Sequence, residues 1–186
     1  MMSKSLRSLI RKPITRRMID KITQEAFDKT DERSAIIVNV ALMEVGLERL
    51  IKSRLRRLNK EDENMLFGPM GSFGGFASKI RAAYAMGIIG PRTRNDLVAI
   101  NDIRNVFAHA PYHVKFQWNK KLKNRMLDIH MFQFVRAEHR DLSHQQCFLQ
   151  TLSLYAMFIA RDRHKRIKPP QHQTTFLGYK SGMLLM

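Results

Sequence analysis

Cysteine is almost absent from this chain. Cys147 is the only one among 186 residues. A single thiol excludes an intrachain disulfide and any metal site that needs four cysteines. This composition is typical of a reducing compartment, so we expect a cytoplasmic protein. We expect no bound metal and no other cofactor. We also expect Cys147 to be packed in the core.

Long apolar runs are absent as well. The best candidate for a membrane span, residues 142–160, has no charged side chain, but its polar His144, Gln146 and Gln150 would be costly in hydrocarbon. Its large apolar side chains instead recur at the spacing of one helix face. They are Phe148, Leu149, Leu152, Tyr155 and Ile159. The sequence therefore predicts a core helix here and no membrane partner.

Acidic residues are scarce. The chain has 16 Asp and Glu against 33 Lys and Arg, a formal net charge of +17 at pH 7. The surplus lies in residues 1–60 and 111–186, whereas the two signs balance in residues 61–110. Such a surplus indicates a polyanionic partner, RNA or DNA, although a well-solvated surface has the same composition. The cations that we expect to contact nucleic acid are Arg54, Arg56, Arg57, Lys79, Arg81, Lys120, Lys121, Arg163, Lys165 and Arg166.

Strict alternation of apolar and polar residues is nearly absent, and the helical period recurs along most of the chain. The sequence predicts an all-α fold, a compact bundle of about five to six helices with basic N- and C-terminal extensions. We expect a basic helical extension over residues 1–29, a single bundle domain over 30–166 and a flexible tail over 167–186. Inside the bundle, the expected helices span residues 32–58, 76–89, 93–109 and about 120–134, and a last one runs from about 143 through the basic residues up to 168, where Pro169 and Pro170 end it.

Local signals mark the boundaries of these helices. Thr93 with Asp96, and Ser143 with Gln146, have the spacing of capping boxes at helix starts. The polar residues 59–64 predict a connection between two helices.

Glycines gather between two of the expected helices. Because glycine tolerates backbone conformations and close approaches that other residues resist, Gly68, Gly71, Gly74 and Gly75 predict a structured turn at a helix entry. Its backbone N–H groups, with Lys79 and Arg81 nearby, offer an anion site as an alternative. A nucleotide-binding P-loop is not indicated, because the segment lacks a Gly-Lys-Ser/Thr ending and a preceding strand.

The segment Arg104-Asn105-Val106-Phe107-Ala108-His109 is the strongest candidate site. It joins a planar cation suited to phosphate oxygens, a carboxamide and an imidazole that titrates near neutrality. Pro111 disfavours helix at residue 110, so the helix is expected to end close to His109. At ~100° per residue, Arg104 and His109 lie about 140° apart around a straight helix. They can act together only if the helix bends after Phe107 or if a two-fold dimer joins two copies.

A structural role is the alternative for the same residues. Arg104 would then form a buried ion pair with Glu44 or Glu48 on the helix over 32–58, while Asn105 and His109 would satisfy the last carbonyls of their own helix.

Two segments resemble known families. Residues 66–89, with Gly-Pro-Met-Gly-Ser-Phe and Lys-Ile-Arg-Ala-Ala-Tyr-Ala-Met-Gly-Ile-Ile, followed by residues 96–109, resemble the mannitol operon repressor family. That resemblance implies a small helical bundle that regulates transcription. The Arg-x4-His pattern of Arg104 and His109 resembles the signature of the HEPN superfamily, which includes dimeric, metal-independent endoribonucleases.

The second resemblance implies a role for each residue of the motif. His109 would be the general acid or base for attack of a ribose 2′-hydroxyl on the adjacent phosphate, Arg104 would stabilise the phosphorane, and Asn105 would orient either group.

Three functions therefore stand as hypotheses. The first is a homodimeric regulator of transcription that acts through nucleic acid or through a protein partner. The second is a metal-independent endoribonuclease that uses Arg104 and His109. The third is a protein-binding adaptor without catalysis.

Overall fold

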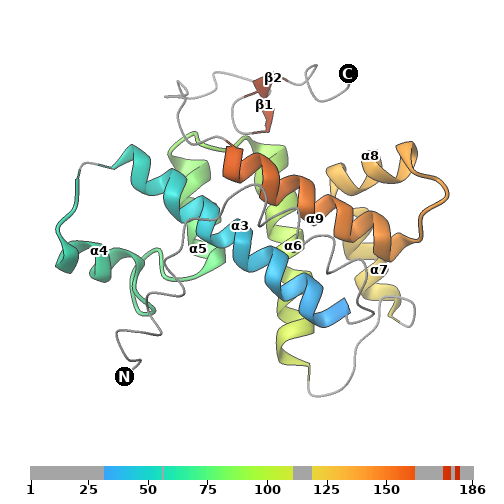
Figure 1. Ribbon diagram of the computed structural model, residues 1–186, viewed down its shortest axis with the longest axis horizontal. Coiled ribbons are helices and arrows are strands. Elements are labelled where there is room, and N and C mark those ends of the chain that lie inside the picture. The colour runs from blue at the N-terminus through green and yellow to red at the C-terminus, as the bar shows by residue number, and fades with distance from the viewer. Residues whose placement is uncertain (1–31, 56, 111–118, 162–173, 177–178, 181–186) are drawn as a thin grey trace.

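The computed structural model describes residues 32–55, 57–110, 119–161, 174–176 and 179–180. These residues form α-helices and one short hairpin, labelled as in Figure 1. The elements are α3 Glu32–Arg54, α4 Lys60–Phe67, α5 Phe76–Ala85, α6 Pro91–His109, α7 Lys120–Leu127, α8 His130–Glu138, α9 His144–Arg161, β1 Thr174–Phe176 and β2 Tyr179–Lys180. The all-α fold is confirmed, with more helices than the five to six predicted.

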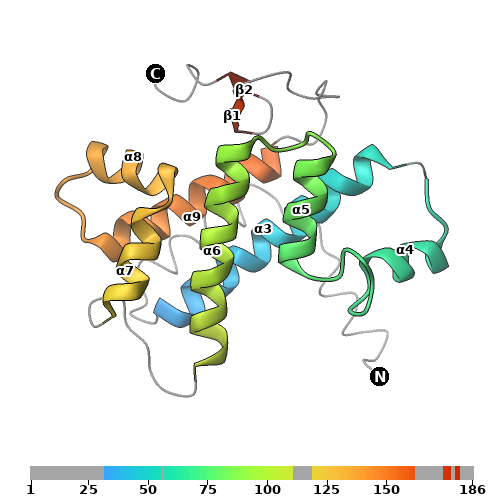
Figure 2. The ribbon, with the colours of Figure 1, turned by 180° about the vertical axis from the view of Figure 1, so that it is seen from behind.

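The core lies between the long helices. α3 packs against α9, α5 and α6, and α8 packs against α9, so α3 and α9 form the centre of the bundle (Figures 1 and 2). Gly46 permits this packing, because a Cβ atom there would lie 2.4 Å from Cγ2 of Ile159 on α9. The apolar face predicted within residues 142–160 is buried, as is Cys147. Burial of each large side chain contributes about 1.5–3 kcal/mol.

The connection predicted over residues 59–64 is wrong, because α4 begins there. The Asn59 side chain accepts a hydrogen bond from the Asp62 N–H at 2.8 Å, and the first turn carries Glu61, Asp62 and Glu63. An Asn cap followed by acidic residues stabilises a helix N-terminus, where the peptide dipoles leave partial positive charge. The preceding helix, α3, ends at Arg54 and not at residue 58.

The glycine-rich segment is a structured turn that leads into α5, as predicted. A Cβ atom on Gly71 would lie 2.5 Å from the carbonyl oxygens of Met65 and Leu66, and one on Gly74 would lie 2.4 Å from the carbonyl oxygen of Gly68. The turn therefore folds back on the end of α4 at distances that only glycine allows.

Helix α5 ends four residues before the predicted boundary. Gly87 has a φ of 65°, and the N–H groups of Gly87 and Ile88 bond to the carbonyls of Tyr84 and Ala83 at 3.0 and 2.8 Å. This is a Schellman termination, which glycine in the left-handed conformation permits. Gly90 and Pro91, which follow the predicted end of this helix, start α6: Gly90 is its N-cap and Pro91 occupies the first turn.

The capping box predicted for Thr93 and Asp96 is also wrong. Asp96 is 1% exposed and lies on the inner face of α6, where it accepts hydrogen bonds from the backbone N–H groups of His130 and Met131, each at 3.0 Å. It therefore caps α8, whose own N-cap residue, Ile129, has no capping side chain. The Tyr155 hydroxyl donates to the same carboxylate at 2.6 Å, and burial and the Asp96 charge raise the pKa of Tyr155 well above its ordinary value.

The single helix predicted over 120–134 is two helices, α7 and α8, separated at Asp128 and Ile129. The capping box at the start of α9 is confirmed: the Ser143 N–H donates to Oε1 of Gln146 at 2.9 Å, and the Gln146 N–H donates to Oγ of Ser143 at 3.2 Å.

Two expected segments lie largely outside the described residues. The extension over 1–29 is one of them, and most of the tail over 167–186 is the other. The described part of that tail forms the antiparallel β1–β2 hairpin, whose first strand lies beside α6. Within the described residues, no helix is long and apolar enough to cross a membrane.

Candidate functional site

The Arg104–His109 segment forms the last turns of α6. The helix is continuous to His109, and the backbone of Ala110 is extended, at φ −63° and ψ 128°, as expected for a residue before proline. The Ala110 N–H still bonds to the carbonyl of Val106 at 2.9 Å. The predicted helix end is therefore confirmed, and the bend after Phe107 that would bring Arg104 toward His109 is not present.

Arg104 is partly buried and bonded within its own helix. Its Nη1 donates to Oδ1 of Asn105 at 3.0 Å. Its Nε is buried and has no hydrogen-bond partner. The guanidinium is thus oriented by Asn105 and still has an unused donor, which is unusual for a buried polar atom.

The predicted ion pair of Arg104 with Glu44 or Glu48 is wrong. Both carboxylates bind Lys79 instead, at 2.9 Å from Glu44 and 3.1 Å from Glu48. Lys79 lies in the first turns of α5 where that helix packs on α3, and it is 3% exposed. Lys79 is therefore a structural cation and not the surface contact to nucleic acid that its charge predicted.

His109 is exposed at the end of α6. The neighbouring carbonyl of Ala108 accepts a hydrogen bond from Nη2 of Arg33, on α3, at 3.0 Å. Arg33 thus provides the carbonyl contact that the structural alternative gave to His109 and Asn105. Because α6 stays helical, Arg104 and His109 diverge, and a single subunit does not direct both at one atom.

The predicted nucleic-acid contacts fall into three groups. Arg57, Arg81, Lys120 and Lys121 are exposed, and Arg54 is partly buried. Lys79 is buried. The remaining four, Arg56, Arg163, Lys165 and Arg166, lie outside the described residues.

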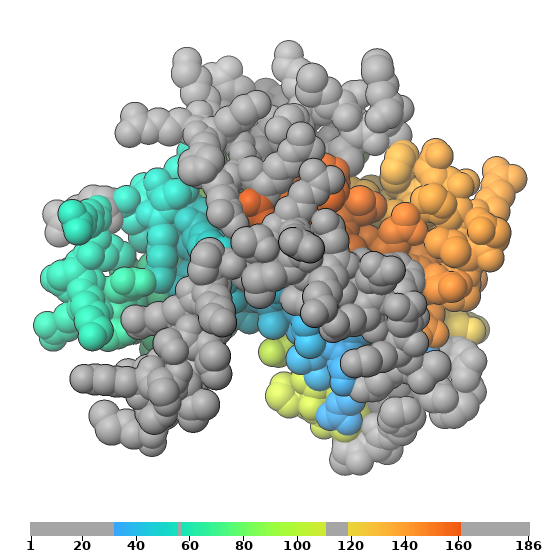
Figure 3. Space-filling model, viewed as in Figure 1, coloured from blue at the N-terminus to red at the C-terminus, as the bar shows by residue number. Residues whose placement is uncertain are grey.

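The structure adds three cations that sequence reasoning did not select. Lys123 follows Lys120 and Lys121 on α7, Arg136 is on α8, and Arg140 comes just after that helix. Helices α7 and α8 lie at the end of the bundle opposite α4 (Figures 1 and 2), and the orange α8 region and the teal α4 region are on opposite sides of the surface in Figure 3. We call these five residues the basic end. None of the five pairs with a carboxylate among the described residues, whereas Arg125 is paired with Asp102 and Asp128 at 2.6 and 3.1 Å.

The pKa of His144 is sensitive to the positive charges of this region. Its ring stacks on Phe132, with centroids 6.2 Å apart. Partial burial lowers the pKa of His144, and the charges of Arg136 on α8 and Lys123 on α7 lower it further. Lys123 and Arg136 therefore both lie close enough to His144 to disfavour its protonated form.

In the described part of the chain, no cluster of three or more His, Cys, Asp or Glu side chains could hold a metal ion. A comparison of the chain with family models, with curated proteins and with solved structures finds no match. The resemblances to the mannitol operon repressor family and to the HEPN superfamily therefore stay predictions, and the site has to be interpreted from its own geometry.

Proposed function

We propose that this protein is a cytoplasmic regulator of transcription that binds nucleic acid through its basic end. The observation that carries the proposal is the group of five cations there, Lys120, Lys121, Lys123, Arg136 and Arg140, which have no carboxylate partner among the described residues. The regulatory part of the proposal comes from the resemblance of residues 66–89 and 96–109 to the mannitol operon repressor family.

Unpaired cations at one end of a small protein suit a phosphate backbone. Each Lys or Arg that neutralises a phosphate releases a condensed counterion, so affinity falls steeply with salt. Cations already paired with carboxylates, such as Arg125, contribute less because their charge is compensated. Contacts of this kind hold RNA or DNA without selecting its sequence.

The test compares two triple variants in binding to a labelled duplex DNA and a labelled RNA over a salt series. The variant with Lys120, Lys121 and Lys123 changed to Gln is expected to bind at least about tenfold more weakly at 50 mM salt, and its log–log salt slope for DNA is expected to fall by about 2.7. Fluorescence anisotropy measures both quantities.

The matched control changes Arg57, Lys60 and Arg81 to Gln, which removes the same charge from exposed positions near α4 and on α5. It is expected to stay close to wild type. An equal loss in both variants would mean that net charge alone acts. No binding by wild type even at low salt would contradict the proposal and favour a protein partner or an adaptor.

RNA cleavage is the second candidate, and the exposed imidazole of His109 at the end of α6 supports it. The Arg104 guanidinium, on the same helix, is oriented by Asn105. Because the two side chains diverge in one subunit, this activity requires a homodimer in which the motifs of two copies face one another.

Cleavage is tested with mixed RNA in EDTA, at matched concentrations of wild type and His109→Ala. Loss of a general acid or base is expected to lower the rate by about 10²–10⁴-fold. Gel analysis measures the rate, and light scattering measures the oligomeric state. Equal cleavage by both proteins, or none by wild type, would exclude this candidate.

A further inference from the structure

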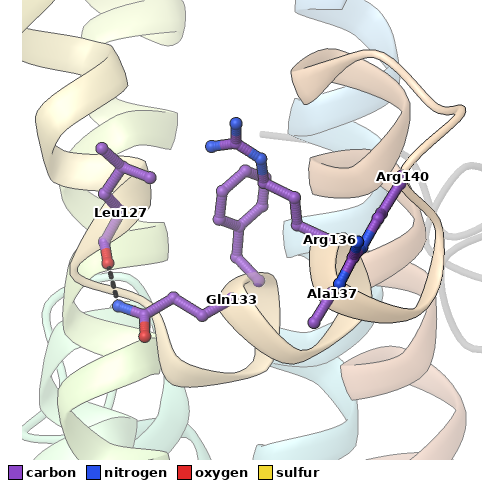
Figure 4. A pocket seen from close by; sticks show the side chains of 6 residues that line it. Leu127, Gln133, Arg136, Ala137 and Arg140 are labelled. Carbon is purple, nitrogen blue, oxygen red and sulfur yellow. Dashed lines mark hydrogen bonds between the residues drawn. The ribbon is translucent and has the colours of Figure 1, made fainter.

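A pocket opens at the basic end, between α7 and α8. It has a volume of about 420 Å³ and is lined by Leu127, Phe132, Gln133, Arg136, Ala137 and Arg140. Figure 4 shows Leu127 facing Arg136 and Ala137 across it. The Gln133 side chain donates to the carbonyl of Leu127 at 2.6 Å, which ties the two helices together and holds the walls in place.

The charge of the lining is of one sign. Its ionisable residues are Arg136 and Arg140, four positions apart, and no carboxylate is among the described residues that line the pocket. Neither arginine has an ion pair or hydrogen bond in the described part of the chain. Two guanidinium groups without anions at the wall of a pocket are suited to an oxyanion, which accepts forked hydrogen bonds from each of them.

Two exposed apolar residues also line the pocket, beside the polar Gln133. Leu127 is 40% exposed although it is a large hydrophobic residue, and Ala137 is exposed beside Arg136. The volume is within the range of pockets for small molecules, about 300–1,000 Å³. An inorganic anion would leave this apolar wall in water, whereas an anion with an apolar body would cover it.

We propose that this pocket binds a small phosphate monoester with an apolar body, whose phosphate is held by Arg136 and Arg140 and whose body lies against Leu127 and Ala137. This proposal is independent of nucleic-acid binding, because the ligand it names needs neither a base nor a sugar. The neighbouring charge supports it: Arg136 and Lys123 lower the pKa of His144, so a bound phosphate would remove a repulsion that the free protein contains.

The test is calorimetric titration of the full chain with phenyl phosphate. We expect a Kd below about 1 mM. In the variant R136Q/R140Q the affinity is expected to fall at least about tenfold, since both charge-assisted contacts are lost. Inorganic phosphate and phenol, which supply the anion and the apolar body separately, are each expected to bind more weakly than phenyl phosphate.

The matched control is R57Q/R81Q, which removes two exposed arginines outside the pocket. It should bind phenyl phosphate within about twofold of wild type, because exposed charges at a distance are screened. Circular dichroism verifies that both variants are folded. A second measurement is the NMR titration of His144, whose pKa is expected to rise when phenyl phosphate saturates wild type.

Several results would overturn the proposal. They are the absence of binding at millimolar phenyl phosphate, an equal loss in R136Q/R140Q and R57Q/R81Q, and inorganic phosphate binding as tightly as phenyl phosphate. A failure of DNA and RNA binding, by contrast, would leave this site in place, because phenyl phosphate tests it alone.

Discussion

Replacing Asp96 with alanine is expected to lower the free energy of unfolding by about 4 kcal/mol. The carboxylate is 1% exposed and accepts from two backbone N–H groups of α8 and from the Tyr155 hydroxyl. Nδ1 of His130 lies 3.1 Å from the same carboxylate. Alanine removes the carboxylate that accepts from the first N–H groups of α8 and from the buried Tyr155 hydroxyl. Urea unfolding followed by circular dichroism measures the loss.

The control for this prediction lies on the same helix. Asp102 binds Arg125, and its side chain is about half exposed, so Asp102→Ala is expected to reduce stability by at most about 1 kcal/mol. Tyr155→Phe removes only one donor to the charged carboxylate and should fall between the two, at about 1.5–3 kcal/mol. Equal losses for Asp96→Ala and Asp102→Ala would show that the buried network contributes no more than a surface pair.

Asp96 also shows why part of this fold could not be predicted from the sequence. Its spacing from Thr93 matches a capping box, but Pro91 already begins the helix one turn earlier. The groups that Asp96 binds lie 34, 35 and 59 positions further along the chain. Partners this far along the chain cannot be identified from local spacing. The Ser143–Gln146 box was predicted correctly, because its two members are three residues apart and bond to each other.

In the candidate site, too, local features were predictable and contacts between distant segments were not. The position of His109 at a helix end follows from Pro111, and the offset from Arg104 follows from the helical period, so both were predictable. The partner of Arg104 could not be predicted, because Glu44 and Glu48 are paired with Lys79 from α5, which lies far from them in the sequence. The pocket also escaped prediction, since it exists only because α7 and α8 are separate helices, tied by Gln133.

Lys79→Met is expected to lower the free energy of unfolding by about 3 kcal/mol. The substitution keeps most of the side-chain volume but removes the cation between Glu44 and Glu48, which are one turn apart on α3 and whose side chains are 23% and 26% exposed. Two partly buried carboxylates then repel each other, and among the described residues the remaining cation paired with them is Lys52, 2.6 Å from Glu48. Chemical denaturation of the variant and wild type measures the difference.

Two further variants separate this explanation from simple loss of charge. Arg81→Met removes an exposed cation two positions further along α5 and is expected to change stability by less than about 0.5 kcal/mol. Adding Glu44→Gln and Glu48→Gln to Lys79→Met should restore part of the lost stability, because the uncompensated charges are then gone.

The nucleic-acid affinity of folded Lys79→Met should match that of wild type. Lys79 is buried and its charge is compensated by two carboxylates, so it does not contact a phosphate. If Lys79→Met lost as much affinity as the variant with Lys120, Lys121 and Lys123 changed to Gln, Lys79 would have to be a contact to nucleic acid after all.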